Sequence, residues 1–160
     1  MDALAVIGGS GAYVLLAEAL PVVESLPGRD TPFGVSAPIH RLEVAGGPVW
    51  FLSRHGEKGY ERTARFINYK ANIYALRDLG AHRILAWSGP GAINPALRIG
   101  QYVVPDDLLD ETYARENTYF TGGSVGFVRQ SPVFCPGLRS VALEACHSTG
   151  RLVADGGTYA

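Results

Sequence analysis

The sequence has almost no net charge, few cysteines and no long apolar run. Fourteen Lys and Arg residues against fifteen Asp and Glu residues give a formal net charge of -1. Such a chain has no excess of positive charge to attract nucleic acid or an anionic membrane, so we expect neither as a partner. Any anion site must therefore be formed by a few residues in one place. Because there is no run of about 18 apolar residues and no basic-then-apolar leader, we expect neither a membrane span nor a signal peptide.

Metal and disulfide chemistry also have little support. Cys135 and Cys146 match neither a disulfide framework nor a zinc-ligand cluster, so we expect both to be free thiols, buried or merely tolerated, in a reducing cytosol. His40, His82 and His147 lack chemically suitable neighbours in the sequence, and we expect them to be surface or edge residues and not ligands. The sequence therefore predicts no metal site.

What is present is the composition of a globular chain. Of its 160 residues, 47% are hydrophobic and 18% are charged, well outside the range of disordered sequences. This length suits one domain with a real core and is short for two, and no internal repeat, low-complexity tract or linker divides it. We expect a single domain over residues 1–160.

Short apolar runs that alternate with helical periodicity indicate an α/β fold. The expected strands are residues 4–7, 39–44, 49–53, 84–87 and 102–104, with a further strand pair in 151–160. The expected helices are residues 12–20, 64–79 and 136–149. The two central strands should form an antiparallel hairpin, so the prediction is a mixed, largely parallel twisted sheet flanked by helices.

Two of these helices have an expected inner face. Phe66, Tyr69, Ile73 and Leu76 recur at helical spacing in the second helix. In the third helix the expected inner face is formed by Leu138, Val141 and Ala145. Residues 27–34 are dense in turn formers and should be a surface loop, and residues 110–129 show little periodicity and should form a long excursion.

Three of the expected strands end in a segment that could bind an anion: Gly8-Gly9-Ser10-Gly11, Arg54-His55-Gly56 and Ser88-Gly89-Pro90-Gly91. Glycines let backbone N–H groups approach an anion, serine adds a hydroxyl, and arginine can bind phosphate through paired donors. In open α/β sheets, ligands gather outside the carboxyl ends of the strands. The three segments together therefore predict one phosphate pocket.

Each segment alone has a simpler interpretation. The first could be a tight turn without a ligand, and the Arg-His pair could be an ordinary surface feature. Spacing excludes two better-known motifs: a dinucleotide loop would need glycine where Val14 stands, and a nucleophile elbow would need glycine where Ala12 stands. Pro90 has no N–H group, so the last segment offers one backbone donor fewer.

A set of ordered motifs resembles the methylthioadenosine phosphorylase branch of the purine nucleoside phosphorylases. The first three are residues 6–11 (VIGGSG), 31–34 (TPFG) and 54–56 (RHG), followed by 67–73 (INYKANI) and 99–105 (IGQYVVP). Residues 134–136 (FCP) and 157–159 (GTY) also fit, so the resemblance covers essentially the whole chain.

The resemblance implies phosphorolysis of a purine nucleoside, with methylthioadenosine or methylthioinosine as the favoured substrate and other purine nucleosides next. It implies a cytoplasmic homotrimer that uses inorganic phosphate as co-substrate, with no metal and no organic cofactor. Matched by motif, the residues expected to hold phosphate are Ser10, Arg54, His55, Ser88 and Gly89. Those expected near the ribose and base are Pro90, Gly91 and Tyr69.

The sequence stops at Ala160, before the segments with which members of this family grip the purine. We therefore expect the fold to be incomplete at its C-terminus and residues 1–160 alone to have little activity. Two alternatives stay open. One is a noncatalytic module that binds nucleoside or phosphate, and the other is a nucleosidase that uses water, although water needs no Arg-His anion site.

Overall fold

A computed structural model describes residues 3–122 and 131–160. The chain divides into two compact units, Met1–Pro90 and Gly91–Ala160, each of which is described by itself. The expectation of one domain over the whole chain stays a prediction.

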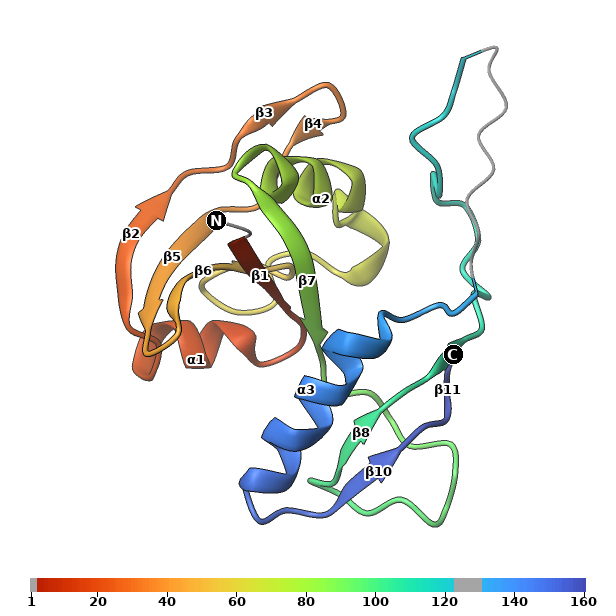
Figure 1. Cartoon of the computed structure of the whole chain (residues 1–160). Coiled ribbons are helices and arrows are strands. Elements are labelled where there is room, and N and C mark those ends of the chain that lie inside the picture. Colours follow the sequence, from red (N-terminus) through yellow and green to blue (C-terminus); the bar gives the residue numbers. More distant parts are fainter. Residues whose placement is uncertain (1–2, 123–130) are drawn as a thin grey trace. The chain divides into compact units, whose positions relative to one another are not determined.

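The first unit contains one central sheet and two α-helices (Figure 1). Its strands are β1 (Ala3–Gly8), β2 (Val22–Leu26), β3 (Asp30–Thr31), β4 (Gly34–Val35), β5 (Ile39–Val44), β6 (Gly47–Ser53) and β7 (Ala81–Trp87). Its helices are α1 (Ala12–Glu18), the 3-10 turn η1 (Ala64–Phe66) and α2 (Tyr69–Asp78).

The central sheet is mixed, with strand order β2-β5-β6-β1-β7. β1 lies between β6 and β7 and is parallel to both, whereas β5 is antiparallel to β6 and to β2. The expected hairpin of β5 and β6 is confirmed, and so is the mixed α/β architecture. β1, β6 and β7 consequently end at the same edge of the sheet.

The two faces of this sheet are buried by different helices. Ala5 and Leu52 belong to the core cluster that contains Ala75 and Leu76 of α2. Phe51, on the opposite face because side chains alternate along a strand, packs with Ala12 and Leu16 of α1. A helix thus covers each face, which holds β1 and its neighbours in a fixed register.

The predicted helix over residues 64–79 is wrong in its first turn. The α-helix begins only at Tyr69, because the Asn68 side chain accepts a hydrogen bond from Ala71 N (3.1 Å) and caps it. Phe66 lies before this cap and is 71% exposed, so it does not belong to the inner face. Strand β2 was not predicted, because its residues show no clear alternation of apolar and polar side chains. In the fold its hydrophobic residues are mostly exposed.

The second unit is built from two short parallel strand pairs and one helix. Its elements are β8 (Tyr102–Val104), β9 (Asp107–Leu108), α3 (Pro136–Ser148), β10 (Val153–Asp155) and β11 (Thr158–Tyr159). β10 pairs with β8 and β11 with β9, so the two last strands do not pair with each other. Residues 110–122 contain neither helix nor strand, and the rest of the expected excursion, 123–129, lies outside the described residues.

Helix α3 packs against β8 and β10. Its expected inner face is right at Leu138 but wrong at the other two positions, because Val141 is 61% exposed and Ala145 is exposed as well. The half-buried stripe is instead Leu138, Ala142 and Cys146. Among residues 3–122 and 131–160, no helix has the length and hydropathy that crossing a membrane requires.

Candidate functional site

Three loops leave the carboxyl edge of the central sheet from neighbouring strands. Gly8, at the end of β1, pairs with Ser53 of β6 and with Trp87 of β7. The backbone continues this pairing into the loops: Arg54 N donates to Gly8 O (3.0 Å), and Gly9 N donates to Trp87 O (2.6 Å). Adjacent strands are about 4.8 Å apart, so the three predicted anion-binding segments start side by side.

The first and third loops are in direct contact. A Cβ atom placed on Gly9 would lie 2.7 Å from Ser88 Cβ and 3.0 Å from Trp87 O. Only glycine allows the two backbones to come this close. Ser10 and Ser88 are half-buried, whereas Gly89 and Pro90 are exposed. The structure therefore brings Ser10 and the Ser88-Gly89 pair to one place.

A chain of polar contacts joins the first loop to the loop after β6, which we call the Arg-His loop (residues 54–62). Ser10 Oγ lies 2.9 Å from Tyr60 Oη, which lies 3.4 Å from His55 Nε2. Arg54 Nε in turn donates to His55 Nε2 (3.3 Å). The side chains of Ser10 and Arg54, which come from different loops, are thus connected through His55 and Tyr60.

His55 is buried, with 1% of its surface exposed. Its ring stacks on that of Tyr60, with centroids 4.2 Å apart and planes 27° apart. Its Nδ1 lies 2.9 Å from Arg62 O, which can only accept, and its Nε2 faces Arg54 Nε, which can only donate. These two contacts assign the neutral Nδ1–H tautomer, with Nε2 as the acceptor that orients Arg54.

The Arg-His loop is itself held by side chains. Ser53 Oγ donates to Gly56 O (2.6 Å), and Glu61 Oε1 accepts from the backbone N of Glu57 (3.1 Å) and Lys58 (2.8 Å). Gly56 has a φ of +118°, and a Cβ there would lie 2.6–2.8 Å from atoms of Glu61. These internal hydrogen bonds close the Arg-His loop into a turn.

His40 also supports this loop, which corrects the expectation that it lies at the surface. It is 4% exposed on β5, an inner strand of the sheet. Its Nδ1 contacts Ser25 Oγ (2.9 Å), and its Nε2 lies 2.6 Å from Glu57 Oε1. His82 and His147 are exposed, as expected.

Of the residues expected near the ribose and base, Tyr69 lies in the first unit and Gly91 in the second. Tyr69 opens α2 and its hydroxyl donates to Ala64 O (2.8 Å). Gly91 begins the second unit, so its position relative to Ser10 and Arg54 is not described. The ligand contacts of these residues, and those of the five expected phosphate-binding residues, stay predictions.

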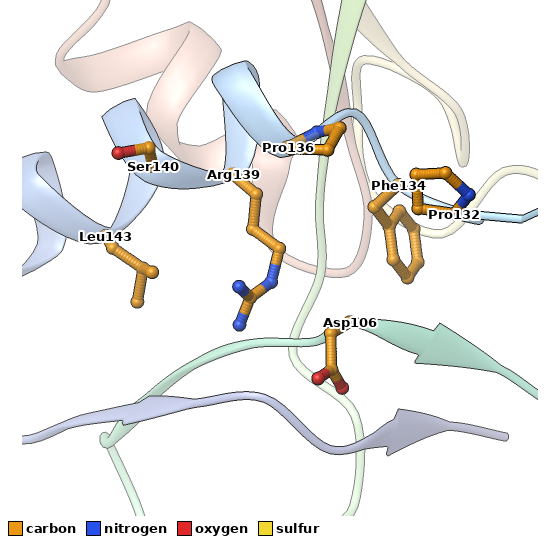
Figure 2. A pocket seen from close by; sticks show the side chains of 7 residues that line it. All are labelled: Asp106, Pro132, Phe134, Pro136, Arg139, Ser140 and Leu143. Carbon is orange, nitrogen blue, oxygen red and sulfur yellow. The ribbon is translucent and has the colours of Figure 1, made fainter.

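The second unit has a pocket of its own, lined by Asp106, Pro132, Phe134, Pro136, Arg139, Ser140 and Leu143 (Figure 2). Its charged groups are engaged within the unit. Arg139 donates to Pro105 O (3.0 Å), Val104 O (3.1 Å) and the Asp155 carboxylate, and Asp106 Oδ1 accepts from Gly157 N (2.9 Å). These bonds tie α3 to the strands, so we assign this pocket a structural origin.

Metal ligation has no support in the described part of the chain. No group of three or more His, Cys, Asp or Glu side chains there could hold an ion. Cys135 is exposed and Cys146 is half-buried, and both are free thiols.

The family model described as the phosphorylase superfamily matches residues 3–160. The chain belongs to the phosphorylase superfamily. Among curated members, it is 38% identical over 171 residues to a probable 6-oxopurine nucleoside phosphorylase of Korarchaeum cryptofilum, covering 99% of this chain and 61% of that protein. It is 41% identical over 157 residues to the S-methyl-5'-thioadenosine phosphorylase of Mycolicibacterium smegmatis, covering 97% of this chain and 56% of that protein.

A solved superfamily structure agrees with the fold. A methylthioadenosine phosphorylase from an antarctic soil metagenomic library superposes with a TM-score of 0.87 at 33% identity, over 99% of this chain and 55% of that one. This chain therefore spans between 55% and 61% of the length of each of these three relatives.

Sequence reasoning missed the role of Tyr60. It stands in a polar stretch without periodicity, where an aromatic residue gives no sign of its partner. The available signal was an aromatic side chain five positions after an Arg-His pair, in a loop otherwise rich in charge. Only the folded loop shows that it reaches both His55 and Ser10.

Proposed function

We propose that the protein to which this chain belongs catalyses phosphorolysis of a purine nucleoside. A phosphate oxygen forms a bond to the anomeric carbon while the bond from that carbon to the purine nitrogen breaks. The purine leaves with the bonding electron pair and takes up a proton, and the sugar 1-phosphate is the second product. Methylthioadenosine and methylthioinosine are the favoured substrates, since relatives named for methylthioadenosine are among the matches.

One observation supports this proposal above the others: three loops from the neighbouring strands β6, β1 and β7 converge at one edge of the sheet. Arg54 Nε donates to His55, and within residues 3–122 and 131–160 no protein group hydrogen-bonds to its two terminal nitrogens. Such a guanidinium can bind a phosphate through two parallel N–H groups. Ser10 and Ser88 add hydroxyls on the neighbouring loops.

These donors suit the reaction because phosphate must be desolvated and aimed at a carbon that gains positive charge. Fixed donors do this by positioning the anion before the bond forms, which lowers the entropic part of the barrier. His55 serves this arrangement by orienting Arg54. We further propose that the enzyme needs no metal and no organic cofactor, and that it works as a cytoplasmic homotrimer.

The test is an assay of purine release from methylthioadenosine, methylthioinosine and inosine by the full-length protein, with and without inorganic phosphate. We expect release only with phosphate, together with one equivalent of the sugar 1-phosphate. Release without phosphate would instead identify a nucleosidase. Nucleoside or phosphate binding without release would identify a noncatalytic module, and light scattering of the same sample would test the trimer.

A further inference from the structure

We propose that Tyr60 is a positioning residue of the anion site, acting through Ser10. This inference rests on the proposed function, because it assumes that Ser10 donates to phosphate. Tyr60 and His55 form a stacked pair in which each ring serves one anion-binding side chain. His55 Nε2 accepts from Arg54 (3.3 Å), and Tyr60 Oη contacts Ser10 Oγ (2.9 Å).

The direction of the Tyr60–Ser10 hydrogen bond follows from what surrounds the phenol. The lone pair of His55 Nε2 lies in the ring plane and already accepts from Arg54. The Tyr60 hydroxyl lies 3.4 Å from this nitrogen but only 2.9 Å from Ser10 Oγ, so Ser10 Oγ is the better acceptor for the phenolic hydrogen. The phenolic hydrogen is thus free to go to Ser10 Oγ.

A Ser10 hydroxyl that accepts from Tyr60 keeps its own hydrogen available. A serine hydroxyl has one donor hydrogen and two acceptor lone pairs, and without a partner it rotates among several directions. Occupying one lone pair restricts that rotation and leaves the hydrogen for a further acceptor, such as a phosphate oxygen. A donor that is already polarised by an incoming hydrogen bond is also a stronger donor.

Replacing Tyr60 by Phe separates this role from packing, because the ring can still stack on His55. Tyr60 is 55% exposed, so the substitution places no new apolar group in the core. We expect inorganic phosphate to bind to the full-length Tyr60→Phe protein roughly three- to tenfold more weakly by calorimetry, the usual effect of one neutral hydrogen bond. The KM for phosphate should rise by the same factor, while the KM for nucleoside stays unchanged.

Tyr74→Phe is the matched control. It removes a phenolic hydroxyl from α2, where the ring packs edge-on against Phe33, 5.6 Å between centroids, and it should leave phosphate affinity unchanged. A second control uses Ser10→Ala. If Tyr60 acts through Ser10, adding Tyr60→Phe to Ser10→Ala should weaken phosphate binding no further.

Every other outcome contradicts one named part of the proposal. Unchanged phosphate affinity in Tyr60→Phe overturns the positioning role, and tighter binding overturns it in favour of a hydroxyl that competes with the anion. Additive losses in the double variant would mean that Tyr60 does not act through Ser10. Failure of the wild-type protein to bind phosphate at all would overturn the proposed function together with this inference.

Discussion

Nε2 of His40 lies 2.6 Å from a carboxylate oxygen of Glu57, which ties an inner strand of the sheet to the Arg-His loop. The two atoms are close but do not form an aligned hydrogen bond, so this is a close polar contact. The other ring nitrogen contacts Ser25 Oγ of β2 (2.9 Å). One buried imidazole therefore links β2, β5 and the loop that presents Arg54.

Replacing His40 by Ala should destabilise the fold. The change removes a buried side chain that joins Ser25 to Glu57 and opens a cavity beside β5, and losses of this kind cost roughly 1–3 kcal/mol. Urea unfolding measures the loss. His82→Ala on the exposed part of β7 is the control and should change the free energy of unfolding little. Equal losses in both variants would contradict the role given to His40.

Replacing Arg54 by Ala should weaken phosphate binding by roughly 1.5–3 kcal/mol, the value of a charged hydrogen bond, and should affect nucleoside binding less. Lysine should restore only part of the loss, because it cannot make the paired contact. Calorimetry with each ligand separates the two effects. Arg83→Ala, on an exposed position of β7, is the matched control. Equal losses for both ligands would point to a folding defect.

Replacing Gly9 by Ala should push the first and third loops apart. The new Cβ would meet Trp87 O at 3.0 Å and Ser88 Cβ at 2.7 Å, and a backbone oxygen cannot rotate out of the way. Overpacking of this kind typically costs about 1–3 kcal/mol, and phosphate affinity should fall with it. Gly46→Ala is the control, since nothing lies within 4 Å of a Cβ there. If Gly9→Ala bound phosphate normally, the two loops would not form one site.

Gly56 and Gly59 form a matched pair for the Arg-His loop. Both have a φ of +118°, so alanine is strained at either position by roughly 1–3 kcal/mol. At Gly56 the new Cβ would also strike Glu61, which is held by two backbone N–H groups, whereas at Gly59 nothing lies within 4 Å. We expect Gly56→Ala to unfold at lower urea than Gly59→Ala. Equal midpoints would mean that Glu61 moves aside freely.

The sequence predicts the strands of the site better than its side-chain contacts. The apolar runs ending at Gly8, Ser53 and Trp87 are confirmed as β1, β6 and β7, because short apolar runs bounded by glycine or polar residues leave a strong local signal, although β7 is mostly exposed. The burial of His40 and the stacking of Tyr60 depend on partners far along the chain, so no local pattern indicates them. The start of α2 was missed for a related reason: a helical stripe continues past Asn68, and only the cap shows where the helix begins.

The strand order has a consequence for how the protein is made. β1 is synthesised first, yet both of its neighbours, β6 and β7, come later, and β7 follows the whole of α2. On the ribosome, β1 can pair with β6 once Ser53 has emerged, but its other edge stays unpaired until β7 is complete at Trp87. If the three loops bind phosphate as proposed, the complete site exists only after the Ser88-Gly89-Pro90-Gly91 loop has emerged as well. A phosphate bound there would then stabilise only chains in which β7 has joined the sheet.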